Sequence, residues 1–203
     1  IISMLIFGAV GIFAKYIHLS SAQIAWCLSL IGCLCLLLIL LSRQHKNSRT
    51  ECWRNRWLLF AASITLSGNW IFLFQAYKTT TIANAALSYY AAPIFVILAS
   101  PLLFDEKLAP RKLFCVGIAF TGLCLILQNG TTVAEENSLE GMAYGLCAAA
   151  FYAALTVLNK YIHDLDGLTR TFCQLAGSAA ILTAYLFITG EHVPVSLSSQ
   201  DIL

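Results

Sequence analysis

Residues 21–42 read SAQIAWCLSLIGCLCLLLILLS and contain no charged side chain. A helix needs about 20 consecutive apolar residues to cross the hydrocarbon core of a bilayer, and this stretch has that length. Its second half, Leu34–Leu41, is apolar at every position, whereas a strand of a membrane barrel alternates apolar and polar residues. The stretch therefore predicts a transmembrane helix, because a helix pairs all of its own backbone groups in lipid.

The composition of the whole chain also indicates a membrane protein. Of its 203 residues, 59% are hydrophobic and only 11% are charged. So few charges cannot cover the surface of an ordinary soluble domain, and the high hydrophobicity excludes a disordered chain. A net charge of +2 offers no basic surface to a phosphate backbone, so nucleic acid is not an expected partner.

Uncharged stretches of similar length recur along the chain and predict seven transmembrane helices in all. The first is short, and we expect it to lack its start. The fold class is therefore all-α and integral to the membrane. The predicted spans are Ile2–Ala14, Ser21–Ser42, Trp57–Tyr77, Thr79–Phe104, Leu113–Gly130, Gly141–Asn159 and Thr171–Gly190.

Lysine and arginine in the connecting loops predict the orientation of these helices. When alternate loops are counted together, ten basic residues fall on one side of the membrane and two, Lys15 and Lys78, on the other. Cytoplasmic loops carry the excess of Lys and Arg, so the side with ten is expected to be cytoplasmic. The expected location is the inner or plasma membrane, which the chain crosses several times.

A four-residue sequence occurs twice in the chain. Lys15–His18 reads KYIH and recurs at 160–163, an offset of 145 that encloses five predicted helices. An odd number of helices inserts the second copy upside down, and inverted repeats are a recurrent build of secondary transporters. The offset predicts ten helices in a five-plus-five arrangement, with the first repeat at 1–130 and the start of a second at 139–203. Chance similarity is the alternative. Two copies of 145 residues exceed 203, so the chain is expected to be a fragment or a truncated copy.

Five short motifs follow one another at a characteristic spacing. They are GNW at 68–70, QAYK at 75–78, YYAAP at 89–93, DEKL at 105–108 and the glycine pair of 117–122. In this order they resemble the EamA-type transporters of the drug/metabolite transporter superfamily. The resemblance implies a carrier that exports small organic metabolites or amino acids. One departure is residues 23–27, QIAWC, which lack the arginine that many members have at this point.

Nine residues in or near the predicted spans are candidates for a substrate pathway. Asn69 and Gln75 carry amides that are costly in lipid unless paired, so they are expected to face the bundle interior, where they bind another helix or a substrate. Pro93 has no N–H and frees the carbonyl of Tyr89, which predicts a broken or kinked helix. Lys15 either extends to the interface or attracts an anionic solute at the external mouth. The nine are Lys15, Asn69, Trp70, Gln75, Tyr89, Tyr90, Pro93, Tyr152 and Asn159.

Metal and cofactor chemistry is not indicated. Seven of the eight cysteines lie in predicted spans, where a thiol behaves as a small apolar group, and all four histidines lie in loops. The spacing of Gly141 and Gly145 predicts instead a face for close helix packing. The sequence therefore predicts no cofactor.

Two other classes of function stay open beside the carrier. A membrane-embedded enzyme acting on a lipid-like substrate would need clustered acids, for which Asp105 and Glu106 are the best pair. A small-solute channel would need no inverted repeat. The expected partners of a carrier are membrane lipid and a small-molecule solute, and the oligomeric state is open, with a homodimer among the alternatives.

Overall fold

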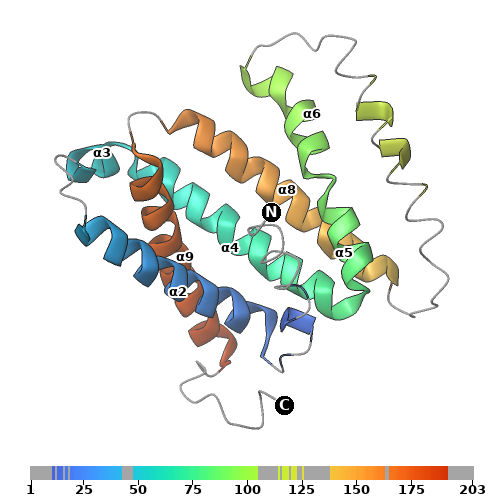
Figure 1. Ribbon diagram of the computed structural model, residues 1–203, viewed down its shortest axis with the longest axis horizontal. Helices are drawn as coiled ribbons and strands as arrows, with labels where there is room; N and C mark the ends of the chain where they lie inside the picture. Colours follow the sequence, from blue (N-terminus) through green and yellow to red (C-terminus); the bar gives the residue numbers. More distant parts are fainter. Residues whose placement is uncertain are drawn as a thin grey trace.

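The computed structural model describes residues 19–42, 48–104, 138–162 and 165–191, with isolated positions between 11 and 17 and between 114 and 125. Every regular element in these ranges is a helix, arranged as Figure 1 shows. The helices are α2 (Ser21–Ser42), α3 (Ser48–Arg54), α4 (Arg56–Thr79), α5 (Ile82–Tyr89), α6 (Ala92–Phe104), α8 (Ser138–Tyr161) and α9 (Gly167–Thr189).

Five stretches of the described chain are long and apolar enough to cross a membrane. They are Ser21–Ser42, Arg56–Thr79, Ile82–Ala99, Leu139–Tyr161 and Gly167–Thr189. The prediction of an all-helical, multi-pass membrane protein is therefore confirmed. The spans predicted at Ile2–Ala14 and Leu113–Gly130 lie outside the described residues except for a few helical positions, so seven spans and ten helices stay predictions.

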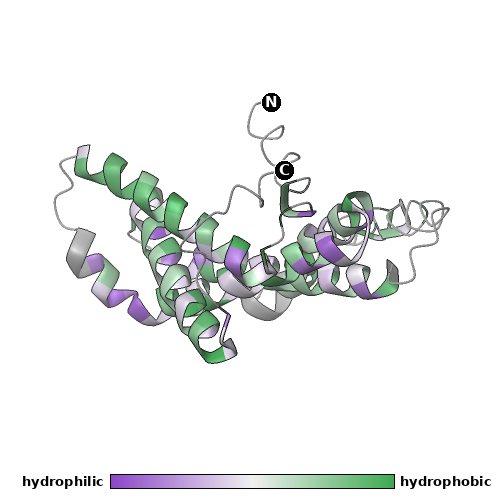
Figure 2. Cartoon of the chain, turned by 90° about the horizontal axis from the view of Figure 1, so that it is seen from below, coloured by the Kyte–Doolittle hydropathy of each residue, from purple (hydrophilic) through white to green (hydrophobic). Residues whose placement is uncertain are grey.

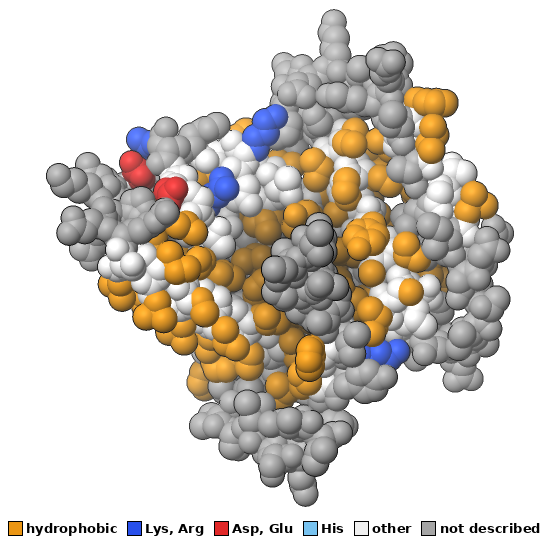
Figure 3. Space-filling view, in the orientation of Figure 1, with side chains coloured by type: hydrophobic (Ala, Val, Ile, Leu, Met, Phe, Trp, Pro, Cys, Tyr) orange, Lys and Arg blue, Asp and Glu red, His pale blue; other side chains and the backbone are white. Residues whose placement is uncertain are grey.

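The surface of the helices suits a lipid solvent. Large apolar side chains such as Leu38 and Leu41 of α2 are mostly exposed, because no other described helix covers them. Hydrophobic residues dominate the long helices in Figure 2, and in Figure 3 they lie between charged side chains that gather toward two ends of the molecule. This distribution matches a bundle whose middle faces hydrocarbon and whose ends face water.

The turns between helices gather at these two ends. At one end, Lys15 Nζ donates to the carbonyl oxygen of Thr80 at 3.4 Å. At the other, the Arg170 guanidinium donates to the carbonyl oxygen of Asn159 at 3.2 Å. We call them the outer end and the inner end, following the orientation that the loop charges predict.

The directions of the helices follow from their contacts. On α2 and α9 the residue numbers run oppositely, since Trp26 Nε1 donates to Thr183 Oγ1 at 2.8 Å while Ser29 Oγ lies 3.2 Å from Ser178 Oγ. These two helices are therefore antiparallel, as two copies of an inverted repeat would be. In Figure 1, α2 and α9 lie side by side.

A different relation holds between α5 and α8. A Cβ added at Gly141 would lie 2.5 Å from the Cβ of Thr80, just before α5, and one added at Gly145 would lie 2.7 Å from the Cβ of Ser88, near the end of α5. Residue numbers thus rise together, and the two helices are parallel. Because α6 continues from α5 toward the other end of the bundle, α8 begins at one end and α6 ends at the opposite end.

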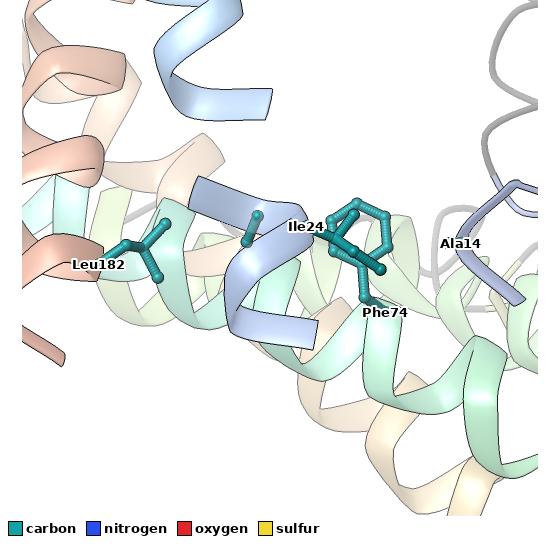
Figure 4. Packing of buried hydrophobic residues seen from close by; sticks show 5 residues of the cluster. Ala14, Ile24, Phe74 and Leu182 are labelled. Atoms are coloured by element: carbon teal, nitrogen blue, oxygen red, sulfur yellow. The ribbon is translucent and has the colours of Figure 1, made fainter. Parts of the chain in front are cut away.

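A hydrophobic cluster joins α2, α4 and α9. Ile24, Phe74 and Leu182 are buried there with Ala14 and Ala25 (Figure 4). Burying such side chains stabilises a soluble core by removing apolar area from water, but between membrane helices the gain comes from close van der Waals packing. This cluster fixes α2 and α9 on one side of α4.

Buried hydroxyl groups join the same three helices nearer the membrane centre. Ser178 Oγ of α9 lies 3.2 Å from Ser29 Oγ of α2 and 2.9 Å from Ser67 Oγ of α4. The close approach needs Gly177, because a Cβ there would lie 2.3 Å from Ser63 Oγ. Interhelical hydrogen bonds and small residues are the usual means of joining helices in lipid.

The basic segment predicted as a loop between residues 42 and 56 contains the short helix α3. The Arg56 guanidinium lies 5.1 Å from the ring centroid of Trp53 and 5.8 Å from that of Trp57. Both tryptophans are more than two-thirds exposed. Tryptophan and arginine together are typical of a membrane interface, so we expect α3 to lie at the boundary between lipid and water.

Candidate substrate site at a broken helix

The fourth predicted span, Thr79–Phe104, is not one helix. Thr79 still belongs to α4, and Thr81 caps α5 by accepting a hydrogen bond from the Asn84 N–H at 3.2 Å. The predicted start of this span was therefore wrong by three residues. The reason is the cap, because a threonine side chain that pairs a free N–H begins a new helix.

A break between α5 and α6 lies within this span. The N–H groups of Ile94 and Phe95 both donate to the carbonyl of Ala91, at 3.0 and 3.1 Å, which starts a new helix at Ala92. Pro93, the second residue of α6, has no N–H to continue the ladder of α5. The predicted break at Pro93 is thus present, and it lies about midway along the span.

Asn69 of α4 is the most buried amide beside the break, with only 2% of its surface exposed. Its Nδ2 donates to the carbonyl oxygen of Ala148 on α8 at 2.8 Å and to the hydroxyl of Tyr89 at 3.4 Å. The side chain therefore joins three helices. The sequence leaves two roles open for this amide, binding another helix or binding a substrate. The observed geometry corresponds to the first role, and it also orients the Tyr89 hydroxyl.

A pair of tyrosine rings lies beside this amide. Tyr89 and Tyr152 meet edge to face, with ring centroids 5.7 Å apart and planes at 62°. Tyr77 of α4 lies instead with Trp70 against the hydrophobic cluster between α2, α4 and α9. We name Asn69, Tyr89 and Tyr152 the tyrosine site.

Small residues and stacked rings hold α8 against this site. Phe72 of α4 stacks on Phe151 at 5.5 Å and on Tyr144 at 6.2 Å between ring centroids. The predicted packing role of Gly141 and Gly145 is supported, because an added Cβ at either would lie within 2.7 Å of a side chain of Thr80 or Ser88. The tyrosine site is therefore backed by a tightly packed α4–α8 contact.

Three predicted pathway residues lie apart from the tyrosine site. Gln75 accepts a hydrogen bond from Ser21 Oγ at 2.8 Å and joins α4 to the start of α2. Lys15 lies at the outer end, and Trp70 packs against the hydrophobic cluster between α2, α4 and α9. Gln75 and Trp70 therefore lie on the side of α4 that faces α2.

Asn159 lies at the inner end. Its Oδ1 accepts from Gln174 Nε2 at 2.6 Å, which joins α8 to α9. It is eleven residues from Ala148, roughly 16 Å along a helix at 1.5 Å per residue. Pro93 and Tyr90 are both exposed, Tyr90 to 67%. The structure thus brings together Asn69, Tyr89 and Tyr152, with Tyr90 beside them.

The chemistry of the tyrosine site is that of recognition. It offers an amide, phenolic hydroxyls and ring faces, which bind polar groups and flat or apolar surfaces. Among the described residues, no group of three or more His, Cys, Asp or Glu could hold a metal ion. The four histidines and the pair Asp105 and Glu106 lie outside those residues.

Several helices long and apolar enough to cross a membrane, one of them broken beside a polar, aromatic cluster, are features typical of polytopic membrane transporters. The comparison with protein families agrees: the chain belongs to the EamA-like transporter family, whose model matches residues 1–128. The resemblance seen in the sequence motifs is confirmed.

Curated relatives carry transporter names. The chain is 34% identical over 194 residues to the uncharacterized transporter YxxF of Bacillus subtilis, covering 92% of this chain and 60% of the relative. It is 28% identical to an uncharacterized transporter of Archaeoglobus fulgidus, over 77% of this chain and 53% of the relative. It is 29% identical to one of Helicobacter pylori, over 64% and 44%. The chain thus spans 60% or less of these relatives. No solved structure matches it.

Proposed function

We propose that the protein is a carrier that exports small organic metabolites or amino acids across the cell membrane by alternating access. Family membership makes it a transporter, and the names of its relatives favour transport over an enzyme acting on lipid. The observation that carries the finer proposal is the helix break at mid-membrane, beside which Asn69, Tyr89 and Tyr152 meet. Broken helices of this kind hold substrates in many carriers.

The tyrosine site would hold the solute through two kinds of contact. The edge-to-face pair of Tyr89 and Tyr152 presents a ring face to the apolar or flat part of the solute. The Tyr89 hydroxyl, oriented by the Asn69 amide, presents a donor and acceptor to a polar group. A site built this way accepts several related solutes, because ring faces discriminate less than buried charges.

Alternating access would use the two proposed repeats. Residues 1–130 form the first and 139–203 the start of the second, so the contacts of α2 with α9 and of α4 with α8 join one repeat to the other. The antiparallel course of α2 and α9 supports this arrangement. Rocking of one repeat against the other would open the tyrosine site to the inner and outer ends in turn.

The test is transport by the complete protein in liposomes, measured as counterflow of a panel of labelled metabolites and amino acids. Tyr89→Phe removes only the hydroxyl, so we expect uptake of the preferred solute to fall at subsaturating concentration. Tyr185→Phe is the matched control, since Tyr185 lies exposed on α9. Absence of counterflow for every solute in the panel would refute the proposal. Equal uptake by Tyr89→Phe and Tyr185→Phe would show that the Tyr89 hydroxyl is not part of the site.

A further inference from the structure

Two thiols meet at the inner end of the bundle. Cys52 lies on α3 and Cys173 on α9, 121 residues apart in the chain, and their Sγ atoms are 3.4 Å from each other. This is van der Waals contact, and a disulfide bond of about 2.05 Å needs only a further approach of roughly 1.4 Å. Both thiols are free and partly exposed, so a small oxidant can reach them.

The environment of this pair differs from that of the other cysteines. α2 also passes close to this point, because a Cβ added at Gly32 would lie 3.0 Å from a methyl carbon of Leu175, two residues after Cys173. The pair also joins α3, a short interfacial helix, to a membrane-spanning helix that it otherwise contacts little. Disulfides are rare on the cytoplasmic side of a membrane except where they respond to redox conditions.

We propose that Cys52 and Cys173 are a redox-sensitive pair that forms a reversible disulfide and thereby arrests transport. The oxidant is a peroxide. One thiolate attacks the peroxide oxygen, forming a sulfenic acid and releasing water, and the second thiol displaces a further water as the S–S bond forms. Two thiols and hydrogen peroxide thus give one disulfide and two waters, and a dithiol reductant reverses the change.

The arrest of transport rests on the proposed function. Cys52 belongs to the first proposed repeat and Cys173 to the second, so the disulfide links the repeats at the inner end. If opening toward the cytoplasm separates the repeats at this end, a covalent link prevents that opening. Each cross-linked chain then loses its activity, and the fraction of transport lost equals the fraction of chains cross-linked.

The first experiment detects the disulfide without measuring transport. Membrane vesicles that contain the complete protein are treated with hydrogen peroxide, remaining thiols are blocked with N-ethylmaleimide, and digested peptides are analysed by mass spectrometry. We expect a peptide linking Cys52 to Cys173, which dithiothreitol removes. Cys147→Ser, which removes an exposed thiol of α8, is the control and should leave the linked peptide unchanged. Absence of the peptide, or its replacement by one containing Cys33, would overturn the proposal.

The second experiment measures counterflow on the same vesicles. In the unchanged protein and in Cys147→Ser, peroxide should lower the rate in proportion to the linked fraction, and dithiothreitol should restore it. In Cys52→Ser and Cys173→Ser, peroxide should leave the rate unchanged. A disulfide with undiminished transport would overturn the regulatory role. No transport in any reduced sample would instead refute the proposed function, while the linked peptide would still establish the thiol pair.

Discussion

Replacing Gly145 by alanine tests whether the fit of α8 on α5 holds the tyrosine site in place. The Cβ of an alanine at this position would lie 2.7 Å from the Cβ of Ser88 and 3.2 Å from the carbonyl oxygen of Ala85. Carbon atoms in contact are normally about 3.5–4.0 Å apart, so the two helices must separate by about 1 Å. Neither neighbour is the end of a flexible side chain that could rotate away.

Two opposing terms decide the size of the effect. Overpacking of this kind costs about 1–3 kcal/mol. Alanine is also a better helix former than glycine by about 1 kcal/mol, which offsets part of that cost. We expect a net loss of about 1 kcal/mol of unfolding free energy, roughly a fivefold fall in the ratio of folded to unfolded protein. Gly145→Val should cost more, because its added volume is larger.

Thermal unfolding in one lipid composition and at one heating rate measures this loss. Gly167→Ala is the matched control, because no atom lies within 4 Å of the added Cβ and only the helix-forming gain remains. The control should unfold at the same or a slightly higher temperature, and Gly145→Ala at a lower one. Equal or greater stability of Gly145→Ala would refute the close α5–α8 packing described above.

Two further predictions concern hydrogen bonds between helices. Asn69→Leu removes two interhelical hydrogen bonds from a buried position. We expect the loss of the bond to α8 alone to lower the free energy of unfolding by about 0.6–1.7 kcal/mol. An unchanged unfolding temperature would mean that this bond contributes nothing. Ser178→Ala breaks contacts to α2 and α4 together and should cost about 1.2 kcal/mol, at about 0.6 per bond. Thr171→Ala, an exposed hydroxyl that bonds only within α9, is its control, and an equal loss there would contradict the prediction.

The helices themselves could be predicted from the sequence because charge is excluded from lipid. The uncharged stretch Ser21–Ser42 coincides with α2, and the stretches at 57–77, 141–159 and 171–190 lie within or end one residue beyond α4, α8 and α9. The break near Pro93 was also predictable, since a proline removes a backbone donor wherever it stands. These features depend on local chemistry alone.

The contacts between helices could not be predicted in the same way. A membrane helix is apolar on the side that faces lipid as well as on the side that faces protein, so its sequence pattern does not say which side is buried. Hence the sequence identified Asn69 as a buried amide but not its partner Ala148, and it gave no signal for the role of Ser178. Cys52 and Cys173 lie on separate helices, and only the packing of the chain brings them together.

The bond between Asn69 and Ala148 joins residues that are 79 positions apart in the chain. At synthesis rates of about 5–20 residues per second, Asn69 is made roughly 4–16 seconds before its acceptor exists. During that interval its amide sits in a growing chain without the helix that finally pairs it. The tyrosine site is therefore completed late in biosynthesis, only after α8 has entered the membrane beside α4.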